Sequence, residues 1–452
     1  MRIHLIATGG AVMHNLALAL HNNHHTVTGS DDEIYNPARD RLAKYGLLPK
    51  QMGWHPENIT SNIDAIILGM HARVDNPELL KAQELGIPIY SFPEYIYEHA
   101  KDKIRVVVSG SHGKTTTTSM IMHILRKCNK RFDYLVGAQL EGFERMVKLS
   151  DARLMIIEGD EYLSSALDRR PKFLHYKPQY AIMTGIAWDH INVFPTFKGY
   201  LEQFGLFLEN LAPDASLFFY QKDEHIKQIL KDSKAAFSAT PYEGFKAKTV
   251  GKGTTIPSRW GENVPIQIFG EHNMENLKAA FLVCQEIGIS HDEFFEAVQS
   301  FKGAAKRLQL LRKEWTSNTW LDFAHAPSKV RATVKAVKNQ YANRQLFACV
   351  ELHTFSSLNK IFLPEYQGTL NAADIGVVFF SEHTLKMKEL PPISKADIQA
   401  NFQHPNLYVF TEREPFEAFL KEQDWNKKNL LLMSSGNFQG VDFEKLMEEL
   451  FD

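Results

Sequence analysis

Short apolar runs alternate with helical stretches along almost the whole chain. In the first hundred residues, strands are predicted at 3–8, 25–29, 65–68 and 87–90. A helix is predicted at 11–20, directly after the first of these strands. Such an alternation is typical of parallel sheets flanked by helices. A charged stretch at 98–103 precedes a fresh strand at Arg105, and this change predicts a domain boundary.

Polar residues directly follow the next predicted strands, at 105–109, 154–157 and 181–184. A helix near 272–287 closes this part, and a Gly/Thr-rich turn near residue 251 predicts a small β excursion. The alternation of strands and helices begins again after 301–307, and further strands are predicted at 319–323, 346–350, 375–380 and 430–433. We therefore predict an α/β fold of three domains: Rossmann-like 1–103, central 104–300 with a P-loop ATPase-type site, and Rossmann-like 301–452.

Composition and charge set limits on the class of protein. The chain has 452 residues, of which 44% are hydrophobic and 23% are charged, and its net charge is −2. This balance predicts neither a nucleic acid nor a membrane surface as a partner. No apolar run approaches the roughly 18 residues of a membrane span, and no secretory signal is expected. The three cysteines lie far apart, which favours small core residues in a reducing compartment and predicts a cytoplasmic protein.

The segment from Gly110 to Thr115 carries the strongest chemical signal. Gly110 and Gly113 allow a tight turn whose N–H groups can point at phosphate oxygens, and the helix that follows adds its positive end. Lys114 supplies a charge for the outer phosphates, and the Thr115 hydroxyl can bind Mg²⁺. The spacing is two residues shorter than that of a standard P-loop, but its place between a strand and a helix predicts an ATP site.

Acidic and histidine residues follow the two other strands. Glu158 can complete a magnesium site, with Asp160 and Glu161 as competing ligands. In Asp189-His190, the imidazole could bind metal or transfer a proton, and a helix-capping Asp beside a partly buried His is an equal alternative. Asn273 and Asn276 share one helix face and could meet an adenine edge, although capping is the more common role. Arg307 could reach a phosphate, although such residues usually lie on a solvated surface.

The first domain has a nucleotide signature of its own. Gly9-Gly10 follows the first strand, and Asp31 lies about 20 residues further on, as in dinucleotide-binding folds. The segment is not G-x-G-x-x-G, so a diphosphate other than NAD is at least as plausible a ligand.

Together these motifs resemble the Mur ligase family of ATP-dependent amide-forming enzymes over essentially the whole chain. The landmarks are Thr8-Gly9-Gly10, the 109–117 segment, Glu158-Gly-Asp-Glu161, Asp189-His190, the 272–276 segment, Arg307 and the 322–327 segment. Departures from the family pattern are Gly159 in place of Ala, Leu321 in place of Asp and Ala326 in place of His.

The resemblance implies roles for individual residues. The first domain would bind a UDP-linked muramic acid through Thr8, Gly9, Gly10, Ser30 and Asp31. ATP would be bound by Gly110, Ser111, His112, Gly113, Lys114, Thr115 and Thr116, with Asn276 at adenine, Asp322 at ribose and His325 in the same loop. The catalytic set would be Lys114, Glu158, His190, Asn273 and Arg307, and Mg²⁺ would be held by Thr115, Glu158 and His190.

The implied reaction joins the lactyl carboxylate of UDP-N-acetylmuramate to an amine, through an acyl phosphate. The segments 28–37, 160–168 with 172–176, and 433–438 are similar to those of family members that add the whole tripeptide L-Ala-γ-D-Glu-meso-diaminopimelate. Addition of L-alanine alone is the alternative, with the third domain closing over either amine. A nicotinamide-dependent oxidoreductase and a non-catalytic nucleotide-binding regulator are more remote hypotheses.

Overall fold

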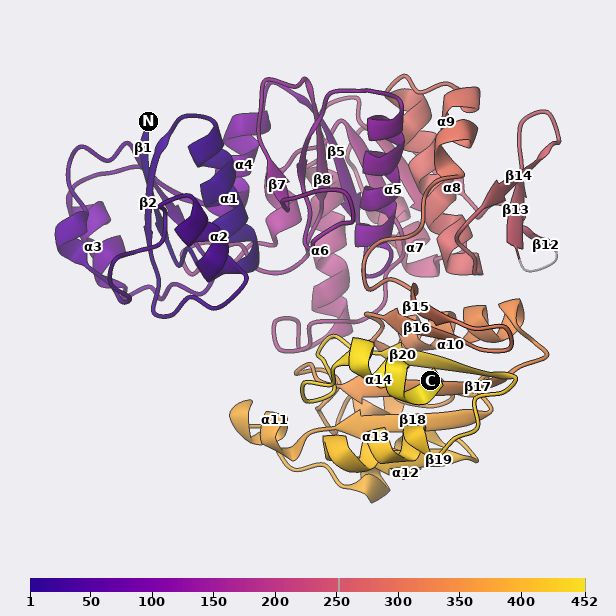
Figure 1. Ribbon diagram of the computed structural model, residues 1–452. Coiled ribbons are helices and arrows are strands. Elements are labelled where there is room, and N and C mark those ends of the chain that lie inside the picture. Colours follow the sequence, from indigo (N-terminus) through magenta and orange to yellow (C-terminus); the bar gives the residue numbers. More distant parts are fainter. Residues whose placement is uncertain (251–252, 452) are drawn as a thin grey trace. The chain divides into compact units, whose positions relative to one another are not determined.

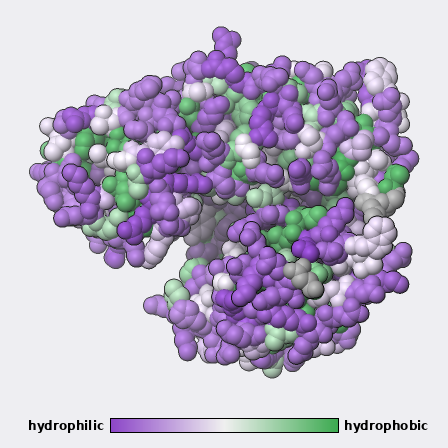
Figure 2. Space-filling model, viewed as in Figure 1, coloured by the Kyte–Doolittle hydropathy of each residue, from purple (hydrophilic) through white to green (hydrophobic). Residues whose placement is uncertain are grey.

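The structure is a computed structural model that describes residues 1–250 and 253–451. The chain forms two compact units (Figure 1). The first unit comprises Met1–Ile186, Lys198–Glu243 and Ala279–Ala297, and the second comprises Ala187–Phe197, Gly244–Lys278 and Val298–Asp452. Hydrophilic residues cover most of the face drawn in Figure 2. Among the described helices, none is both long enough and apolar enough to cross a membrane.

The first unit begins with a sheet of four parallel strands in the order β2-β1-β3-β4. Its elements are β1 (Arg2–Ile6), α1 (Ala11–Asn22), β2 (Thr26–Ser30), α2 (Ala38–Lys44), η1 (Pro56–Asn58), β3 (Ala65–Leu68), α3 (Pro77–Glu84), β4 (Ile89–Ser91) and α4 (Phe92–Ala100). Apolar side chains of β1 and β3, such as Ile6 and Leu68, pack on Leu79 of α3. In this strand order, ligands bind beyond the carboxyl ends of β1 and β3, where the connections diverge.

The strand predicted at 3–8 ends earlier, at Ile6. Ala7 has a left-handed backbone with φ of 65°. This conformation turns the chain, and the Thr8 N–H then donates to the carbonyl of Ser30 at 2.9 Å. The turn places Gly9 and Gly10 directly in front of α1.

The second sheet of the first unit has seven strands in the order β11-β10-β9-β5-β8-β6-β7, all paired in parallel except β6 with β7. Its elements are β5 (Ile104–Ser109), α5 (Lys114–Lys127), β6 (Asp133–Leu135), β7 (Val147–Lys148), β8 (Leu154–Glu158), η2 (Lys172–His175), β9 (Tyr180–Met183), α6 (Phe197–Glu209), β10 (Ser216–Tyr220), α7 (Glu224–Asp232) and β11 (Ser238–Tyr242). Because β5 lies between β8 and β9, the predicted polar clusters follow three adjacent parallel strands.

A small antiparallel sheet, β12-β13-β14, comes next. Its strands are β12 (Lys248–Val250), β13 (Gly253–Pro257) and β14 (Asn263–Ile266), and the helices α8 (Glu271–Glu286) and α9 (His291–Val298) follow. The predicted β excursion is therefore present, but Gly251 and Lys252 of its predicted turn lie outside the described residues.

The second unit contains a six-stranded sheet in the order β15-β16-β20-β17-β18-β19, parallel except for β15 with β16. Its elements are β15 (Gln309–Lys313), β16 (Asn318–Asp322), α10 (Pro327–Gln340), β17 (Gln345–Leu352), η3 (Leu363–Tyr366), β18 (Ile375–Phe380), α11 (Glu382–Met387), α12 (Lys395–Phe402), β19 (Leu407–Phe410), α13 (Arg413–Lys421), β20 (Lys428–Met433) and α14 (Phe443–Phe451). Alternate residues of β17 enter two different cores, Ala348 and Val350 on one face and Phe347 and Cys349 on the other. This two-sided burial explains why the strand reads as a continuous apolar run.

The predicted α/β class is confirmed, because helices accompany three largely parallel sheets. The exact domain boundaries at 103 and 300 stay a prediction. All three cysteines are free, and burial raises the thiol pKa of Cys284 and Cys349 above the ordinary value, as suits core residues.

Candidate active site

The loop between β5 and α5, residues 110–113, is shaped by its two glycines. Gly110 has φ of 120°, and a Cβ there would lie 2.9 Å from the carbonyl oxygen of Gly185. Gly113 has φ of 78° and is the N-cap of α5, where it offers no side chain to the first N–H groups of the helix. We call residues 110–113 the glycine loop. Its form leaves a helix N-terminus aimed at the carboxyl edge of the sheet, an arrangement that suits a phosphate.

Lys114 is held by two oxygen atoms. Its Nζ donates to the carbonyl of Gly110 and to Oε2 of Glu161, both at 2.6 Å. Burial alone would lower the pKa of Lys114, but the carboxylates of Glu161 and Asp160 raise it above the ordinary value. The ammonium therefore stays charged, and its third N–H remains for a further acceptor.

Thr115 and Glu158 form the second contact at this edge. The Thr115 hydroxyl donates to Oε1 of Glu158 at 2.7 Å, and the N–H of Gly137 donates to Oε2 at 2.9 Å. A hydroxyl and a carboxylate at this separation can share one Mg²⁺ ion, because Mg²⁺ takes oxygen ligands and retains several waters. Together with the uncapped start of α5, these residues fit a nucleotide with Mg²⁺.

Tyr200 joins Glu161 and Ser111 at this site, although no prediction included it. Tyr200 of α6 is fully buried, and its hydroxyl donates to Oε1 of Glu161 at 3.0 Å and lies 2.8 Å from the Ser111 hydroxyl. The carboxylate of Glu161 therefore links Tyr200 to Lys114, and its role as a competing metal ligand stays a prediction. Sequence analysis missed Tyr200, because no motif marks a residue this far along the chain from the glycine loop.

The segment 159–176 connects this edge to α4 of the N-terminal sheet. Lys172 donates to Oδ2 of Asp160 at 2.6 Å and lies over the rings of Tyr162 and Phe92 at 5.6 and 5.5 Å. These contacts pack the segment against α4 and fix the backbone that carries Glu161.

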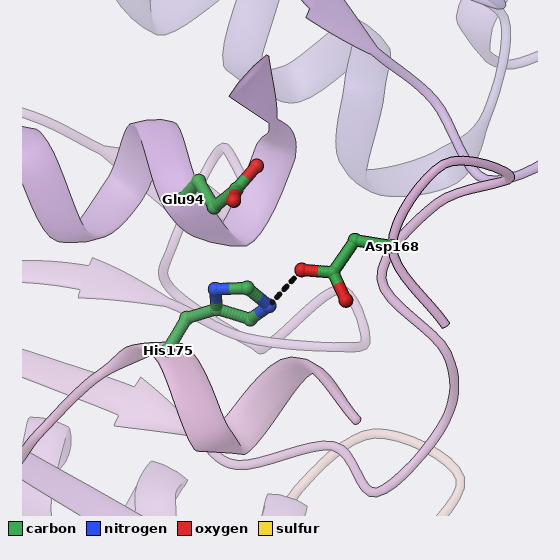
Figure 3. Close-up of side chains that lie close together, drawn as sticks. All are labelled: Glu94, Asp168 and His175. Atoms are coloured by element: carbon green, nitrogen blue, oxygen red, sulfur yellow. Dashed lines mark ion pairs between the residues drawn. The ribbon is translucent and has the colours of Figure 1, made fainter. Parts of the chain in front are cut away.

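Glu94, Asp168 and His175 lie together in the same region (Figure 3). Their potential ligand atoms are within 4.8 Å of one another, a spacing that could suit a metal ion. However, Nη2 of Arg170 lies 2.6 Å from Oδ2 of Asp168 and 3.8 Å from Oε1 of Glu94. The guanidinium already supplies the positive charge, so we interpret the group as an ion-pair network that ties α4 to the 159–176 segment.

The predicted sugar-nucleotide residues meet at the carboxyl end of β1. Oδ2 of Asp31 accepts from the N–H of Gly9 at 2.6 Å, and a Cβ on Gly29 would lie 2.8 Å from Cβ of Thr8. Burial raises the pKa of Asp31 above the ordinary value. Ser30 instead points into a buried cluster and donates to Oε2 of Glu78. The structure therefore brings Thr8, Gly9 and Asp31 together, whereas the Ser30 hydroxyl is engaged elsewhere.

Asp189 and His190 belong to the second unit, several residues beyond the end of β9. Oδ1 of Asp189 accepts from the N–H of His190 at 2.8 Å, and Nζ of Lys329 lies 3.6 Å from Oδ2. Burial alone would raise the pKa of Asp189, but Lys329, His190 and His325 hold it below the ordinary value. His190 has a left-handed φ of 55°, and residues 191–193 form a turn. Asp189 therefore braces this turn and caps no helix, contrary to the capping alternative.

The two asparagines of α8 differ in their surroundings. Nδ2 of Asn273 donates to the carbonyl of Phe269 at 2.8 Å, so this side chain bonds to the backbone that leads into the helix. Asn276 is buried on the same helix. The contact of Asn273 favours a local structural role, and its catalytic role stays a prediction.

Arg307, Asp322 and His325 lie close in the second unit. The two carboxylate oxygens of Asp322 accept from the N–H groups of Leu308 at 2.5 Å and Ala324 at 2.7 Å. The Arg307 guanidinium lies 4.4 Å from the centre of the Phe323 ring. Burial, reinforced by the charge of Lys329, lowers the pKa of His325 to about 4, so its imidazole is neutral at pH 7.

A cavity of about 480 Å³ opens at the carboxyl edge of the C-terminal sheet. Its lining lies at or just beyond the ends of β17, β18, β19 and β20 and consists of Glu351, His353, Ser381, His383, Thr384, Arg413, Glu414, Asn437 and Gln439. Arg413 is oriented by Oε1 of Glu417 at 2.7 Å and by the carbonyl of Gly440 at 3.0 Å. The mixture of cationic and anionic groups suits a ligand that carries both charges.

The predicted residues are thus divided between the units. The first unit contains the predicted residues around the glycine loop, which adjoin one another: Gly110, Gly113, Lys114, Thr115 and Glu158. The second unit contains the other predicted nucleotide and catalytic residues: His190, Asn273, Asn276, Arg307, Asp322 and His325.

Comparisons with known proteins agree with these features. Residues 2–104 match the model described as "Mur ligase family, catalytic domain", and residues 108–284 match "Mur ligase middle domain". The UDP-N-acetylmuramate--L-alanyl-gamma-D-glutamyl-meso-2,6-diaminoheptandioate ligase of Escherichia coli K12 is 27% identical over 461 residues, covering 100% of this chain and 98% of that protein. The UDP-N-acetylmuramate--L-alanine ligase of Lactobacillus acidophilus is 30% identical over 369 residues, covering 79% of this chain and 80% of that protein.

A solved structure shows the same fold. The murein peptide ligase of Psychrobacter arcticus superposes with a TM-score of 0.68 at 21% identity, over 100% of this chain and 98% of that one. The family matches span both the N-terminal and the central sheets, and the aligned relatives extend the likeness through the C-terminal sheet. The chain therefore belongs to the Mur ligase family and is an ATP-dependent, ADP-forming ligase.

Proposed function

We propose that this enzyme joins the lactyl carboxylate of UDP-N-acetylmuramate to the amine of L-Ala-γ-D-Glu-meso-diaminopimelate, in the recycling of peptidoglycan. The observation that carries the ligase chemistry is the arrangement of Lys114, Thr115 and Glu158 around the glycine loop. It provides a cation and a pair of oxygen ligands at a helix N-terminus, which are the groups that phosphoryl transfer requires.

The first half of the reaction activates the carboxylate. A carboxylate oxygen attacks the γ-phosphorus of ATP, the bond to the β–γ bridging oxygen breaks, and an acyl phosphate and ADP are formed. The glycine loop and the start of α5 would hold the phosphates, while Lys114 neutralises charge on the transferred group. Thr115 and Glu158 would hold Mg²⁺, which neutralises further phosphate charge when it is bound.

The second half forms the amide. The amine attacks the acyl carbon, and the tetrahedral oxyanion collapses with loss of phosphate and of the amine proton. In the second unit, we assign catalytic roles to His190 and Arg307. We assign contacts with the nucleotide to Asn276 and Asp322. These roles rest on the family resemblance together with the ordered, partly buried settings of the residues.

The cavity of the C-terminal sheet supports a peptide over a single amino acid. Its volume of about 480 Å³ lies in the range of roughly 300–1,000 Å³ that holds drug-sized ligands. The tripeptide carries three carboxylates and two amines, and Arg413 with Glu351 and Glu414 offers partners of both signs. The E. coli relative whose name contains this peptide aligns with the entire chain.

L-alanine is the second candidate amine, because the L. acidophilus relative named for alanine addition is slightly more identical to this chain. The N-terminal site serves UDP-N-acetylmuramate in both hypotheses, through Thr8, Gly9, Gly10 and Asp31. The cytoplasmic location stays a prediction.

The test is ADP release by the purified enzyme with ATP, Mg²⁺ and UDP-N-acetylmuramate, in parallel with tripeptide, L-alanine or no amine. We expect turnover with tripeptide at a kcat/KM well above that with L-alanine, and product mass confirms the coupling. Turnover with L-alanine alone would reject the recycling assignment, and absence of ADP with every amine would reject the ligase.

A further inference from the structure

Tyr200 occupies an unusual position for a residue of α6. Its side chain is fully buried, yet its hydroxyl reaches the Ser111 hydroxyl at 2.8 Å and Oε1 of Glu161 at 3.0 Å. The other oxygen of Glu161 accepts from Nζ of Lys114 at 2.6 Å, and the same Nζ donates to the carbonyl of Gly110 at 2.6 Å. A continuous chain of hydrogen bonds therefore runs from one side of the glycine loop to the other.

Each contact in this chain limits the freedom of the next. A lysine ammonium on a flexible stem samples several rotamers, and each fixed acceptor removes some of them. Glu161 can hold Lys114 only if its own carboxylate is fixed, and Tyr200 provides a donor from a packed helix. Phe204 supports that position, because its ring meets the ring of Tyr200 edge to face at 5.3 Å between centroids.

We propose that Tyr200 is a positioning residue for phosphoryl transfer, an inference that rests on the proposed function. Its hydroxyl fixes Glu161 and Ser111, and through Glu161 it directs the ammonium of Lys114 toward the transferred phosphate. In this role Tyr200 would act through Glu161 and would not bind nucleotide or acceptor itself. ATP would be bound mainly by the backbone of the glycine loop, so the contribution of Tyr200 would lie in the rate of the chemical step.

The test replaces Tyr200 by phenylalanine, which removes only the hydroxyl. We expect kcat to fall about tenfold, because a hydrogen bond to a charged group is worth at least the roughly 1.4 kcal/mol that corresponds to this factor. The KM for ATP should remain close to that of the wild type. Tyr134→Phe is the matched control, since Tyr134 is also a buried tyrosine but packs on Phe132 and Phe143.

A double-mutant cycle separates positioning from simple loss of stability. Because Tyr200 acts largely through Glu161, the variant with both Tyr200→Phe and Glu161→Gln should be about as slow as Glu161→Gln alone. Wild-type kcat in Tyr200→Phe, or effects that multiply in the double variant, would overturn the proposal. If Tyr200→Phe does not fold, Glu161→Gln alone tests the same link to Lys114, and an unchanged kcat in that variant overturns the proposal.

The wild-type assay distinguishes a failure of the proposed function from a failure of the positioning role of Tyr200. Absence of ADP release from the wild-type enzyme counts against the proposed function. Wild-type turnover that Tyr200→Phe retains in full counts against the positioning role alone.

Discussion

Replacing Asp133 by asparagine should destabilise the first unit. Asp133 lies on β6 with no exposed side-chain surface, and its Oδ2 accepts from Nζ of Lys103 at 2.5 Å and from the N–H of Ser150 at 2.9 Å. His99 approaches the same oxygen at 3.3 Å. These groups connect α4 and the segment that follows it to β6 and to the loop before β8.

The shift in the pKa of Asp133 gives the size of the expected loss of stability. Burial alone would raise it, but the hydrogen bonds from His99, Lys103 and Ser150 lower it from 3.8 to about 2. Each pKa unit corresponds to about 1.4 kcal/mol, so the ionised carboxylate contributes about 2 kcal/mol to the free energy of unfolding. For a domain of this size, that loss lowers Tm by roughly 4–8 °C.

The pH dependence has a definite sign. Because the pKa is lower in the folded state, the stabilisation is complete above about pH 4 and disappears as the pH falls through about 2. Urea unfolding of wild type and Asp133→Asn at several pH values measures the difference. Asp151→Asn is the control, since its ion pair with Arg131 is largely exposed and contributes little. Equal effects of the two variants, or a difference that does not shrink in acid, would refute the reasoning.

Further predictions concern the site and the thiols. Lys114→Ala should lower kcat at least about 100-fold in the ADP-release assay, because a preorganised charge at the transferred phosphate is lost; near-normal turnover contradicts this role. Glu158→Gln should raise the Mg²⁺ concentration for half-maximal activity about tenfold, and an unchanged Mg²⁺ titration argues against the assignment. Arg413→Ala should raise the KM for tripeptide about tenfold while leaving that for ATP unchanged, and the reverse pattern would exclude peptide binding there. A thiol reagent should label partly exposed Cys128 first in the native protein, because the other two thiols are buried; rapid labelling of all three would contradict the fold.

Local patterns predicted the strand, loop and helix around Lys114 well. Apolar runs mark the buried parallel strands, and Gly110 and Gly113 take left-handed conformations that glycine adopts without strain. The neighbouring positions of β5, β8 and β9 were also predictable, because successive βα units tend to place their carboxyl ends at one edge.

Other features depend on contacts between distant parts of the chain. Nothing near Tyr200 in the sequence indicates that its hydroxyl reaches Ser111, because only the fold brings α6 to the glycine loop. Glu161 was considered only as a competing metal ligand, and no local pattern indicated its contacts with Lys114 and Tyr200. Ala7 ended the first strand early, and an alanine gives no local signal for a left-handed turn.

The most direct test of activation through an acyl phosphate follows an oxygen atom of the lactyl carboxylate. UDP-N-acetylmuramate labelled with ¹⁸O in its lactyl carboxylate is incubated with enzyme, ATP, Mg²⁺ and the tripeptide, and the released phosphate is analysed by mass spectrometry. An acyl phosphate transfers one carboxylate oxygen to phosphorus, so we predict one ¹⁸O atom in each phosphate formed from fully labelled carboxylate. Amide formation with unlabelled phosphate would contradict activation through an acyl phosphate.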